Sequence, residues 1–304
     1  MTASCFDISA IIPVYNGQAY VGEAVESVLR QTRPVREVIV VDDGSTDSTP
    51  EVLKSFGGRV RVITQANAGL PAARNSGARA TGGQWLGFLD ADDRWSLDKV
   101  RLVEQYLPGQ DDCGVIYGAA EHRWPDGRVK VLRRDPNWTH EDLIRDLWFR
   151  NLVLGGGSGA VVRRAMFEAA GGFDETLRGG GEDWDLWIRL AAQGRFGYVD
   201  EVFVHRQERT DSMSRQIDRM LESDLRVFAK HIPLFRAQGM SSLRARTSRA
   251  AILRRSGVAY FCSGDRGKAW SALARSAWLN PADIKTLVPL AKLCLHLRHE
   301  HKKK

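Results

Sequence analysis

The sequence has few cysteines, no long hydrophobic run and nothing that indicates disorder. Its four cysteines lie far apart and have no metal-site spacing: Cys5, Cys113, Cys262 and Cys294. We therefore expect reduced thiols in a cytosolic protein. The N-terminal stretch MTASCFD has no basic region and no apolar core, so we expect no signal peptide. The longest late apolar stretch, residues 286–298, is too short to span a bilayer, so we expect no transmembrane segment.

Charge is distributed unevenly along an otherwise ordinary globular composition of 304 residues, 43% hydrophobic and 27% charged. Residues 1–214 carry 25 Lys or Arg against 31 Asp or Glu, whereas residues 215–304 carry 19 against 6. This uneven charge distribution is evidence about binding partners and not about the fold. An anionic membrane surface, an anionic lipid-linked substrate, nucleic acid and a plain solvated helical surface all fit the basic C-terminal region.

Residues 7–118 alternate between strand and helix patterns. Short β-branched or apolar runs predict strands at 8–13, 37–43, 60–64, 84–90 and 114–118. Apolar residues at helical spacing, or Pro at a helix start, predict helices at 19–31, 49–56, 71–80 and 96–107. This order predicts an α/β fold with a parallel sheet and helices on both faces.

Polar loops follow four of these strands, and their sequences are PVYN, DDGSTD, QANAG and DADD. Ligands of such sheets bind beyond the carboxyl ends of the strands. We therefore expect these loops to form one site.

The pattern changes after residue 118. Residues 119–135 predict a β-hairpin that turns at Asp126-Gly127, and a helix is expected at about 139–150. Glycine clusters follow at 155–160 and 178–181, and the pattern is helical from about 215. The first cluster, GGGSGA, lacks the Lys-Ser/Thr of a phosphate-binding P-loop. We predict one domain at 1–214, whose pattern changes at about residue 118, and a basic helical extension at 215–304.

Asp90 and Asp92 are two carboxylates one residue apart at a strand end. Hard oxygen ligands of this kind suit Mg²⁺ or Mn²⁺, with water and phosphate oxygens in the other positions. The alternative is an acidic helix-entry loop in which Asp93 or Ser96 caps the helix at 96–107.

Glu182 and Asp183 open an amphipathic helix directly after three glycines. A carboxylate there is either a helix cap or a general base in a loop that closes on substrate. Trp184 and Trp187 share one face of this helix. We expect Trp187 to pack in the core and Trp184 to stack on an acceptor.

Four motifs in this order resemble a known family: ISAIIPVYNGQAYVGEAVESVLRQT, EVIVVDDGSTDST, NAGLPAARNSGARATGGQWLGFLDADD and GGGEDWDLWIRL. They look like the bacterial-type family 2 glycosyltransferases with the GT-A fold, over roughly residues 7–210. The resemblance implies a Rossmann-like mixed sheet in a glycosyltransferase domain at 1–214, with a nucleotide-sugar half at about 1–118 and an acceptor half at about 119–214. It also implies a nucleotide-diphosphosugar donor, usually a UDP-sugar, a divalent metal and inversion at the anomeric carbon.

The resemblance also assigns roles to individual positions. Pro13 and Tyr15 match residues that border the nucleoside, and Asp43 matches the residue that contacts the base. The matches beside the diphosphate and donor sugar are Gly69, Arg74 and Asn75. Asp90 and Asp92 match the D-x-D metal motif, with Asp92 the more direct metal ligand. Asp183 matches the catalytic base, and Glu182 lies beside it.

The segment VFVHRQERTDSMS (202–214) departs from the family pattern, in which a histidine follows an arginine. Arg206 and the SMS at 212–214 fit that pattern, but His205 precedes Arg206. No role is carried over to His205.

The sequence therefore predicts a metal-dependent, inverting hexosyltransferase that uses a glycan or lipid-linked acceptor in the synthesis of surface polysaccharide or glycoconjugate. We expect it in the cytoplasm or peripherally on the inner face of the cell membrane, with no nucleic-acid partner. One alternative is a nucleotidyltransferase, although PVYNGQAY has no basic residue for a triphosphate loop. The other is a non-catalytic nucleotide-sugar-binding protein, although Asp92 and Asp183 are both present.

Overall fold

The computed structural model describes residues 6–135, 137–207 and 216–301. The chain divides into two compact units. The larger unit comprises Met1–Ile144, Asn151–Arg178 and Glu182–Thr210, and the smaller comprises Arg145–Arg150, Gly179–Gly181 and Asp211–Lys304. The predicted domain boundary at 214 lies outside the described residues. None of the described helices is both long and apolar enough to cross a membrane.

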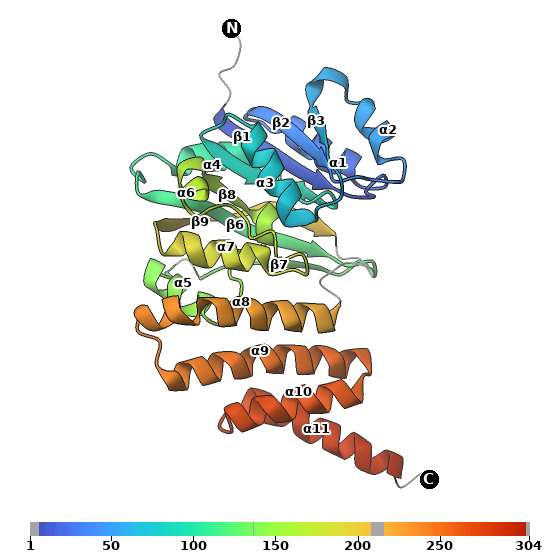
Figure 1. Cartoon of the computed structure of the whole chain (residues 1–304), viewed down its shortest axis with the longest axis vertical. Coiled ribbons are helices and arrows are strands. Elements are labelled where there is room, and N and C mark those ends of the chain that lie inside the picture. Colours follow the sequence, from blue (N-terminus) through green and yellow to red (C-terminus); the bar gives the residue numbers. More distant parts are fainter. Residues whose placement is uncertain (1–5, 136, 208–215, 302–304) are drawn as a thin grey trace. The chain divides into compact units, whose positions relative to one another are not determined.

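The larger unit contains one mixed sheet whose order is β3-β2-β1-β4-β8-β6-β9-β5, with β7 paired to β6 (Figure 1). Its strands are β1 (Phe6–Val14), β2 (Val35–Asp42), β3 (Arg61–Thr64), β4 (Trp85–Phe88), β5 (Asp93–Trp95), β6 (Cys113–Arg123), β7 (Val129–Leu132), β8 (Ala160–Arg163) and β9 (Arg195–Gln207). Its helices are α1 (Val21–Leu29), α2 (Thr49–Lys54), α3 (Leu70–Ala80), α4 (Lys99–Tyr106), α6 (Arg164–Ala169) and α7 (Glu182–Ala191), with short 3-10 turns η1 (Gly57–Arg59) and η2 (Gly156–Gly159). Helix α5 (His140–Leu147) begins in this unit, and its residues from Arg145 onward belong to the smaller unit.

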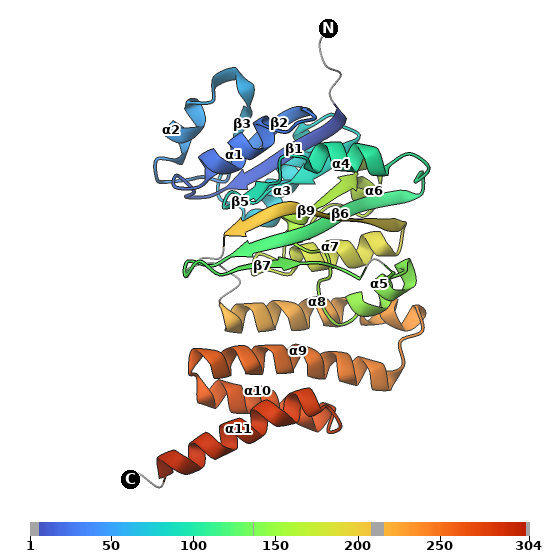
Figure 2. The same cartoon turned by 180° about the vertical axis from the view of Figure 1, so that it is seen from behind.

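The alternation of β1 side chains explains how helices cover both faces. Ile8 and Ile12 belong to the core cluster that includes residues of α1 and α4. These two helices cover one face of the sheet (Figure 2). Ile11 points to the opposite face, where α3 lies so close that a Cβ on Gly77 would come within 2.4 Å of the Ile11 side chain. Gly77 therefore permits the close packing of α3 on the sheet, which brings the N-terminal half of α3 to the carboxyl ends of the strands.

The predicted parallel sheet is confirmed for β3, β2, β1 and β4, which pair in parallel. The fifth predicted strand, now part of β6, runs in the same direction but does not pair with β4, because β8 lies antiparallel between them. The sheet is therefore mixed, as the family resemblance implied. The predicted hairpin is confirmed, but its first arm and the strand predicted at 114–118 are one strand, β6. β5, β8, α6 and β9 were not predicted.

The smaller unit contains four helices, α8 (Ile217–Ala237), α9 (Ser242–Ser263), α10 (Arg266–Leu279) and α11 (Ile284–His301). They confirm the helical pattern predicted after residue 215. Their packing includes a small apolar cluster of Tyr260, Ala269, Ala272 and Leu293.

Candidate active site

Arg74 joins two parts of the larger unit that are far apart in the sequence. Its guanidinium, on α3, donates to Glu182 at the start of α7 at 2.7 Å and to Asp90 after β4 at 2.5 Å. The Arg74 side chain is almost fully buried and also lies 5.0 Å from the centroid of the Phe173 ring. Burial alone would lower the pKa of Arg74, but Asp90 and Glu182 raise it above its ordinary value. The arginine is therefore a permanent cation between the predicted metal motif and the predicted base.

Different cations offset the charges of the acidic loop after β4. Asp90 pairs with Arg74, whereas Asp93 is buried and lies 3.5 Å from the Arg206 guanidinium. Asp92 lies between them in the chain and is half-buried. The prediction that Asp93 or Ser96 caps the next helix is wrong, because α4 begins after Asp98 and Asp93 opens strand β5.

Asp183 is held by two donors at the first turn of α7. Its Oδ1 accepts the backbone N–H of Trp184 at 2.7 Å, and its Oδ2 accepts the side-chain amide of Asn151 at 2.7 Å. Burial raises the pKa of Asp183, although Arg74 opposes this effect. Burial also raises the pKa of Glu182 to about 7, again against Arg74. Since Glu182 is buried on Arg74 and Asp183 is half-buried, Asp183 is the better placed of the two to meet an acceptor.

Asn151 was missed by sequence reasoning. It lies after α5 in a segment with no recognisable motif, and its own Oδ1 accepts the backbone N–H of Val153 at 3.1 Å. That second bond fixes the orientation of the Asn151 amide toward Asp183. No local pattern in the sequence indicates this role.

The predicted nucleoside residues follow β1 and β2. Pro13 is buried in β1, and the Tyr15 side chain just after it is 52% exposed. Asp43 is buried, and its carboxylate accepts bonds from Gln65 Nε2 and from the backbone N–H groups of Ala68 and Gly69, at 2.7, 2.9 and 2.8 Å. Asp43 thus holds the loop between β3 and α3, and a contact with a base stays a prediction.

Gly69 and Asn75 flank Arg74 on α3. Gly69, at φ 91°, precedes the helix and packs against the Arg178 side chain. The Asn75 amide donates to the carbonyl of Phe173 at 2.9 Å and accepts the N–H of the same residue at 2.9 Å. Asn75 therefore fixes the loop before α7, and its predicted contact with the donor remains untested.

The prediction that Trp184 stacks on an acceptor is wrong, because its ring is 1% exposed and belongs to the core. Trp187 is a core residue as expected, and its ring meets Phe196 edge to face. His205 Nδ1 lies 2.9 Å from Glu121 Oε1 across β6 and β9. The SMS stretch at 212–214 lies outside the described residues.

The donor set of Asp90 and Asp92 fits a hard divalent cation. Mg²⁺ sites commonly use one or two carboxylates and complete their coordination with water and substrate phosphates. Among the described residues, no three His, Cys, Asp or Glu side chains converge as a metal cluster. The chemistry of these two carboxylates therefore suits an ion that is shared with a phosphate ligand.

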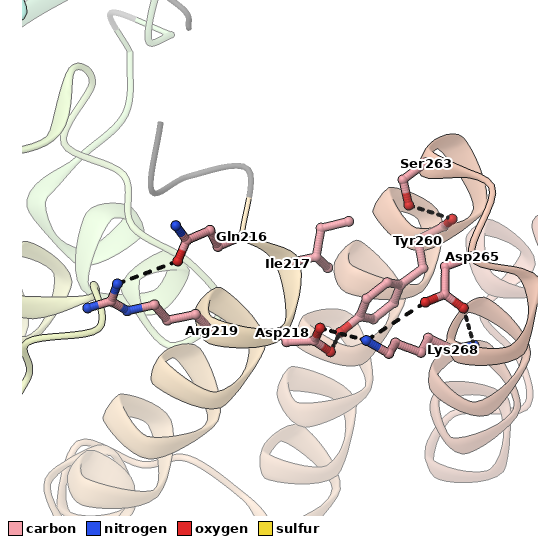
Figure 3. A pocket seen from close by; sticks show the side chains of 8 residues that line it. All are labelled: Gln216, Ile217, Asp218, Arg219, Tyr260, Ser263, Asp265 and Lys268. Atoms are coloured by element: carbon pink, nitrogen blue, oxygen red, sulfur yellow. Dashed lines mark hydrogen bonds and ion pairs between the residues drawn. The ribbon is translucent and has the colours of Figure 1, made fainter. Parts of the chain in front are cut away.

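A separate cavity of about 490 Å³ lies in the smaller unit between α8, α9 and α10 (Figure 3). Asp218 in its wall accepts bonds from Tyr260 and Lys268, both at 2.6 Å, and Lys268 also lies 3.8 Å from Asp265. These polar groups pair with one another, and none of them is a predicted site residue.

A model of the family described as "Glycosyl transferase family 2" matches residues 9–171. The chain belongs to glycosyl transferase family 2. The match includes the loops after β1, β2, β3 and β4, so family membership and the predicted loop cluster rest on the same residues.

Curated relatives of this family 2 chain come from several bacteria. EpsJ of Bacillus subtilis, an uncharacterized glycosyltransferase, is 34% identical over 186 residues, which cover 56% of this chain and 52% of EpsJ. RP339 of Rickettsia prowazekii, also an uncharacterized glycosyltransferase, is 28% identical over 69% of this chain and 68% of its own length. The chondroitin synthase of Pasteurella multocida is 27% identical over 68% of this chain but 21% of its own length. The chain thus spans about half of EpsJ and about a fifth of the synthase.

Solved structures confirm the fold. Residues 1–349 of S. aureus TarS superpose with a TM-score of 0.65 at 18% identity, over 96% of this chain and 91% of that one. The mannosyltransferase PcManGT of Pyrobaculum calidifontis, solved with GDP-Man and Mn²⁺, gives a TM-score of 0.59 at 18% identity, over 96% and 87%. The predicted GT-A glycosyltransferase fold is therefore correct.

Proposed function

We propose that this family 2 glycosyltransferase moves a hexose from a nucleotide diphosphosugar, a UDP-sugar in the first instance, to a hydroxyl of a glycan or lipid-linked acceptor with inversion. The reaction belongs to the synthesis of a surface polysaccharide or glycoconjugate. Relatives support this proposal, since a chondroitin synthase matches the chain and TarS has been solved with UDP-GlcNAc.

One observation carries the proposal. The Asp90–Arg74–Glu182 ion pairs connect the D-x-D loop to the residue beside Asp183. A displacement reaction needs a base on the attacking side and positive charge near the leaving group. In the larger unit, Asp183 would supply the base and Arg74 the positive charge. Arg74 contacts both Asp90 of the D-x-D loop and Glu182 beside the base.

The residues would act in a single displacement. Asp183, ionised and held by Asn151 and the N–H of Trp184, takes the proton from the acceptor hydroxyl as its oxygen forms a bond to the anomeric carbon. The bond between that carbon and the diphosphate oxygen breaks at the same time, and the nucleoside diphosphate leaves with the electron pair. Arg74 lies beside Asp90, where its charge favours the departing diphosphate. We place the nucleoside over Pro13, Tyr15 and the Asp43 loop.

Asp92 and Asp90 would hold Mg²⁺ or Mn²⁺ in this proposal. When bound, such an ion supplies positive charge that stabilises the diphosphate as it leaves. Asp92 is the more direct ligand in this proposal, as its match to the second carboxylate of the D-x-D motif implies, whereas Asp90 Oδ1 accepts from Arg74.

The test is release of nucleoside diphosphate from a panel of UDP-, GDP- and dTDP-sugars with Mn²⁺, together with a thermal-shift assay for each donor. We expect one donor to give release that is lost in Asp92→Ala and kept in Asp126→Ala, which removes an exposed carboxylate at the β6–β7 turn. If the wild-type protein released no nucleoside diphosphate and showed no thermal shift with any donor, the result would contradict the proposal and favour a non-catalytic role.

A second proposal concerns the membrane. Ile284, Leu287 and Val288 have helical spacing on α11 and are 71%, 39% and 50% exposed. Lys285 and Lys292 lie exposed on the same helix, in a C-terminal region rich in Lys and Arg. An exposed apolar stripe flanked by lysines suits an anionic lipid surface. We infer peripheral contact with the inner face of the cell membrane.

Co-sedimentation with vesicles tests this contact. We expect binding to vesicles that contain phosphatidylglycerol but not to phosphatidylcholine alone, and weaker binding for Ile284→Ser with Val288→Ser and for Lys285→Glu with Lys292→Glu. Leu243→Ser is the control, because Leu243 is 66% exposed on α9. Equal vesicle binding by all variants would overturn this proposal. It would also be overturned if the substitutions on α11 reduced self-association of the protein and left vesicle binding unchanged.

A further inference from the structure

The glycine-rich segment Gly155–Gly159 has the sequence GGGSG and is not a phosphate loop. In the structure it lies against two charged groups of the candidate active site, those of Asp183 and Arg74. A Cβ on Gly156 would come within 2.9 Å of Asp183 Oδ2, and a Cβ on Gly157 within 3.0 Å of Arg74 Nη2. Glycine is therefore needed at both positions for the base and the arginine to stay where they are.

Ser158, in the same segment, contacts the D-x-D loop directly. Its side chain is fully buried, and its hydroxyl oxygen accepts the backbone N–H of Asp90 at 3.0 Å. The backbone N–H of Asp93 in turn donates to the carbonyl of Asp90 at 3.0 Å. Ser158 therefore holds the first residue of D-x-D, and that residue holds the one directly after the motif, so Asp92 lies between two hydrogen-bonded neighbours.

Lys99 fixes Ser158 from the other side. The Lys99 side chain is fully buried on α4, and its Nζ donates to the carbonyl of Ser158 at 2.8 Å. The same ammonium group lies 4.2 Å from the centroid of the Trp95 ring. Lysine is rarely buried to this degree unless it is paired. Here the buried Nζ donates to the backbone carbonyl of Ser158 and so fixes the backbone at this residue.

Asp93 completes the support. It is buried at the start of β5, opposite Arg206 in the register with β9, and lies 3.5 Å from the Arg206 guanidinium. Cations therefore lie on both flanks of the loop, Arg74 at Asp90 and Arg206 at Asp93.

We propose that Ser158 is a positioning residue that fixes the backbone of the D-x-D loop, and that Lys99 holds Ser158 in place. Asp90 is then held at its carboxylate by Arg74 and at its amide by Ser158, which sets the direction of Asp92. The proposal rests on the proposed transfer reaction, in which this loop receives the metal and diphosphate. Loss of the serine hydroxyl weakens donor and metal binding more than the displacement step.

Ser158→Ala tests the proposal against Ser248→Ala, which removes another fully buried hydroxyl, one with no hydrogen-bond partner, from α9 of the smaller unit. The first readout is hydrogen–deuterium exchange of residues 85–95 in the protein alone. We expect exchange about fivefold faster in Ser158→Ala, in line with one lost hydrogen bond, and no change in Ser248→Ala. Lys99→Met removes the donor to the Ser158 carbonyl while keeping the length of the side chain, and should change exchange in the same direction.

The second readout separates binding from chemistry. For Ser158→Ala, the donor KM and the Mn²⁺ concentration for half activation should rise about fivefold, with a smaller change in kcat. Exchange and KM equal to those of Ser248→Ala would overturn the proposal, and so would faster exchange spread over the whole sheet. If the wild-type protein neither binds nor cleaves any donor, the proposed function fails, and the exchange measurement alone still decides whether Ser158 fixes the loop.

Discussion

Arg74 and Glu182 are 108 positions apart in the sequence and form a buried ion pair of 2.7 Å. The second arm of the same guanidinium holds Asp90. Removal of one partner from a buried pair leaves an uncompensated charge, which typically costs about 3–5 kcal/mol. The stability of the larger unit and the geometry of its candidate site therefore depend on the same residue.

Arg74→Ala should lower the free energy of unfolding by about 3 kcal/mol or more, because Glu182 and Asp90 both lose their cation. Arg79→Ala is the matched control, since Arg79 is exposed on the same helix and pairs only loosely with Glu175 at 3.9 Å. Denaturant titration measures both variants. Equal stability of Arg74→Ala and Arg79→Ala would show that the ion pairs contribute nothing.

Asn151→Ala should reduce the rate of transfer about tenfold near neutral pH. Its amide donates to Asp183 Oδ2, and loss of a hydrogen bond to a charged group costs about 1.5–3 kcal/mol. Asn151→Asp should be worse, because a second carboxylate at 2.7 Å disfavours ionisation of the base. Steady-state kinetics with the identified donor measures these effects, and Asn137→Ala, in an exposed turn, serves as the control. Wild-type kinetics for Asn151→Ala would remove Asn151 from the site.

The pH dependence of kcat/KM should show the raised pKa of Asp183. A general base works only when ionised, so activity rises with pH through this pKa and is lost as pH falls through it. The acidic limb should therefore have a midpoint above the ordinary value for aspartate, about 3.9. In Asn151→Ala, which removes a donor to the ionised form, the midpoint should move further up. A midpoint at or below the ordinary value would contradict this reading of the Asp183 environment.

The loop cluster could be predicted from the sequence because parallel strands place their carboxyl ends on one edge. Asp90, Asp92 and Asp183 each stand next to a strand end or a helix start, so local pattern was enough to single them out. Arg74 contacts both regions in the structure, and its predicted place beside the diphosphate stays a prediction.

The parts of the fold and site that were not predicted depend on contacts between residues far apart in the sequence. β8 and β9 join the sheet through partners that are remote in the chain, so their short or mixed patterns gave no strand prediction. Trp184 was misassigned because helical spacing shows which residues share a face but not whether a second layer covers that face. Asn151 and Ser158 act through single hydrogen bonds to residues 32 and 68 positions away. No local pattern indicates such contacts.

The most direct test of the central claim is Asp183→Asn, with release of nucleoside diphosphate and donor affinity measured on the same preparation. Asparagine keeps the size of the side chain but cannot take the proton. We expect donor affinity close to that of the wild-type protein and a turnover that falls by about 10²–10⁴-fold. Turnover close to that of the wild-type protein would contradict the assignment of Asp183 as the base.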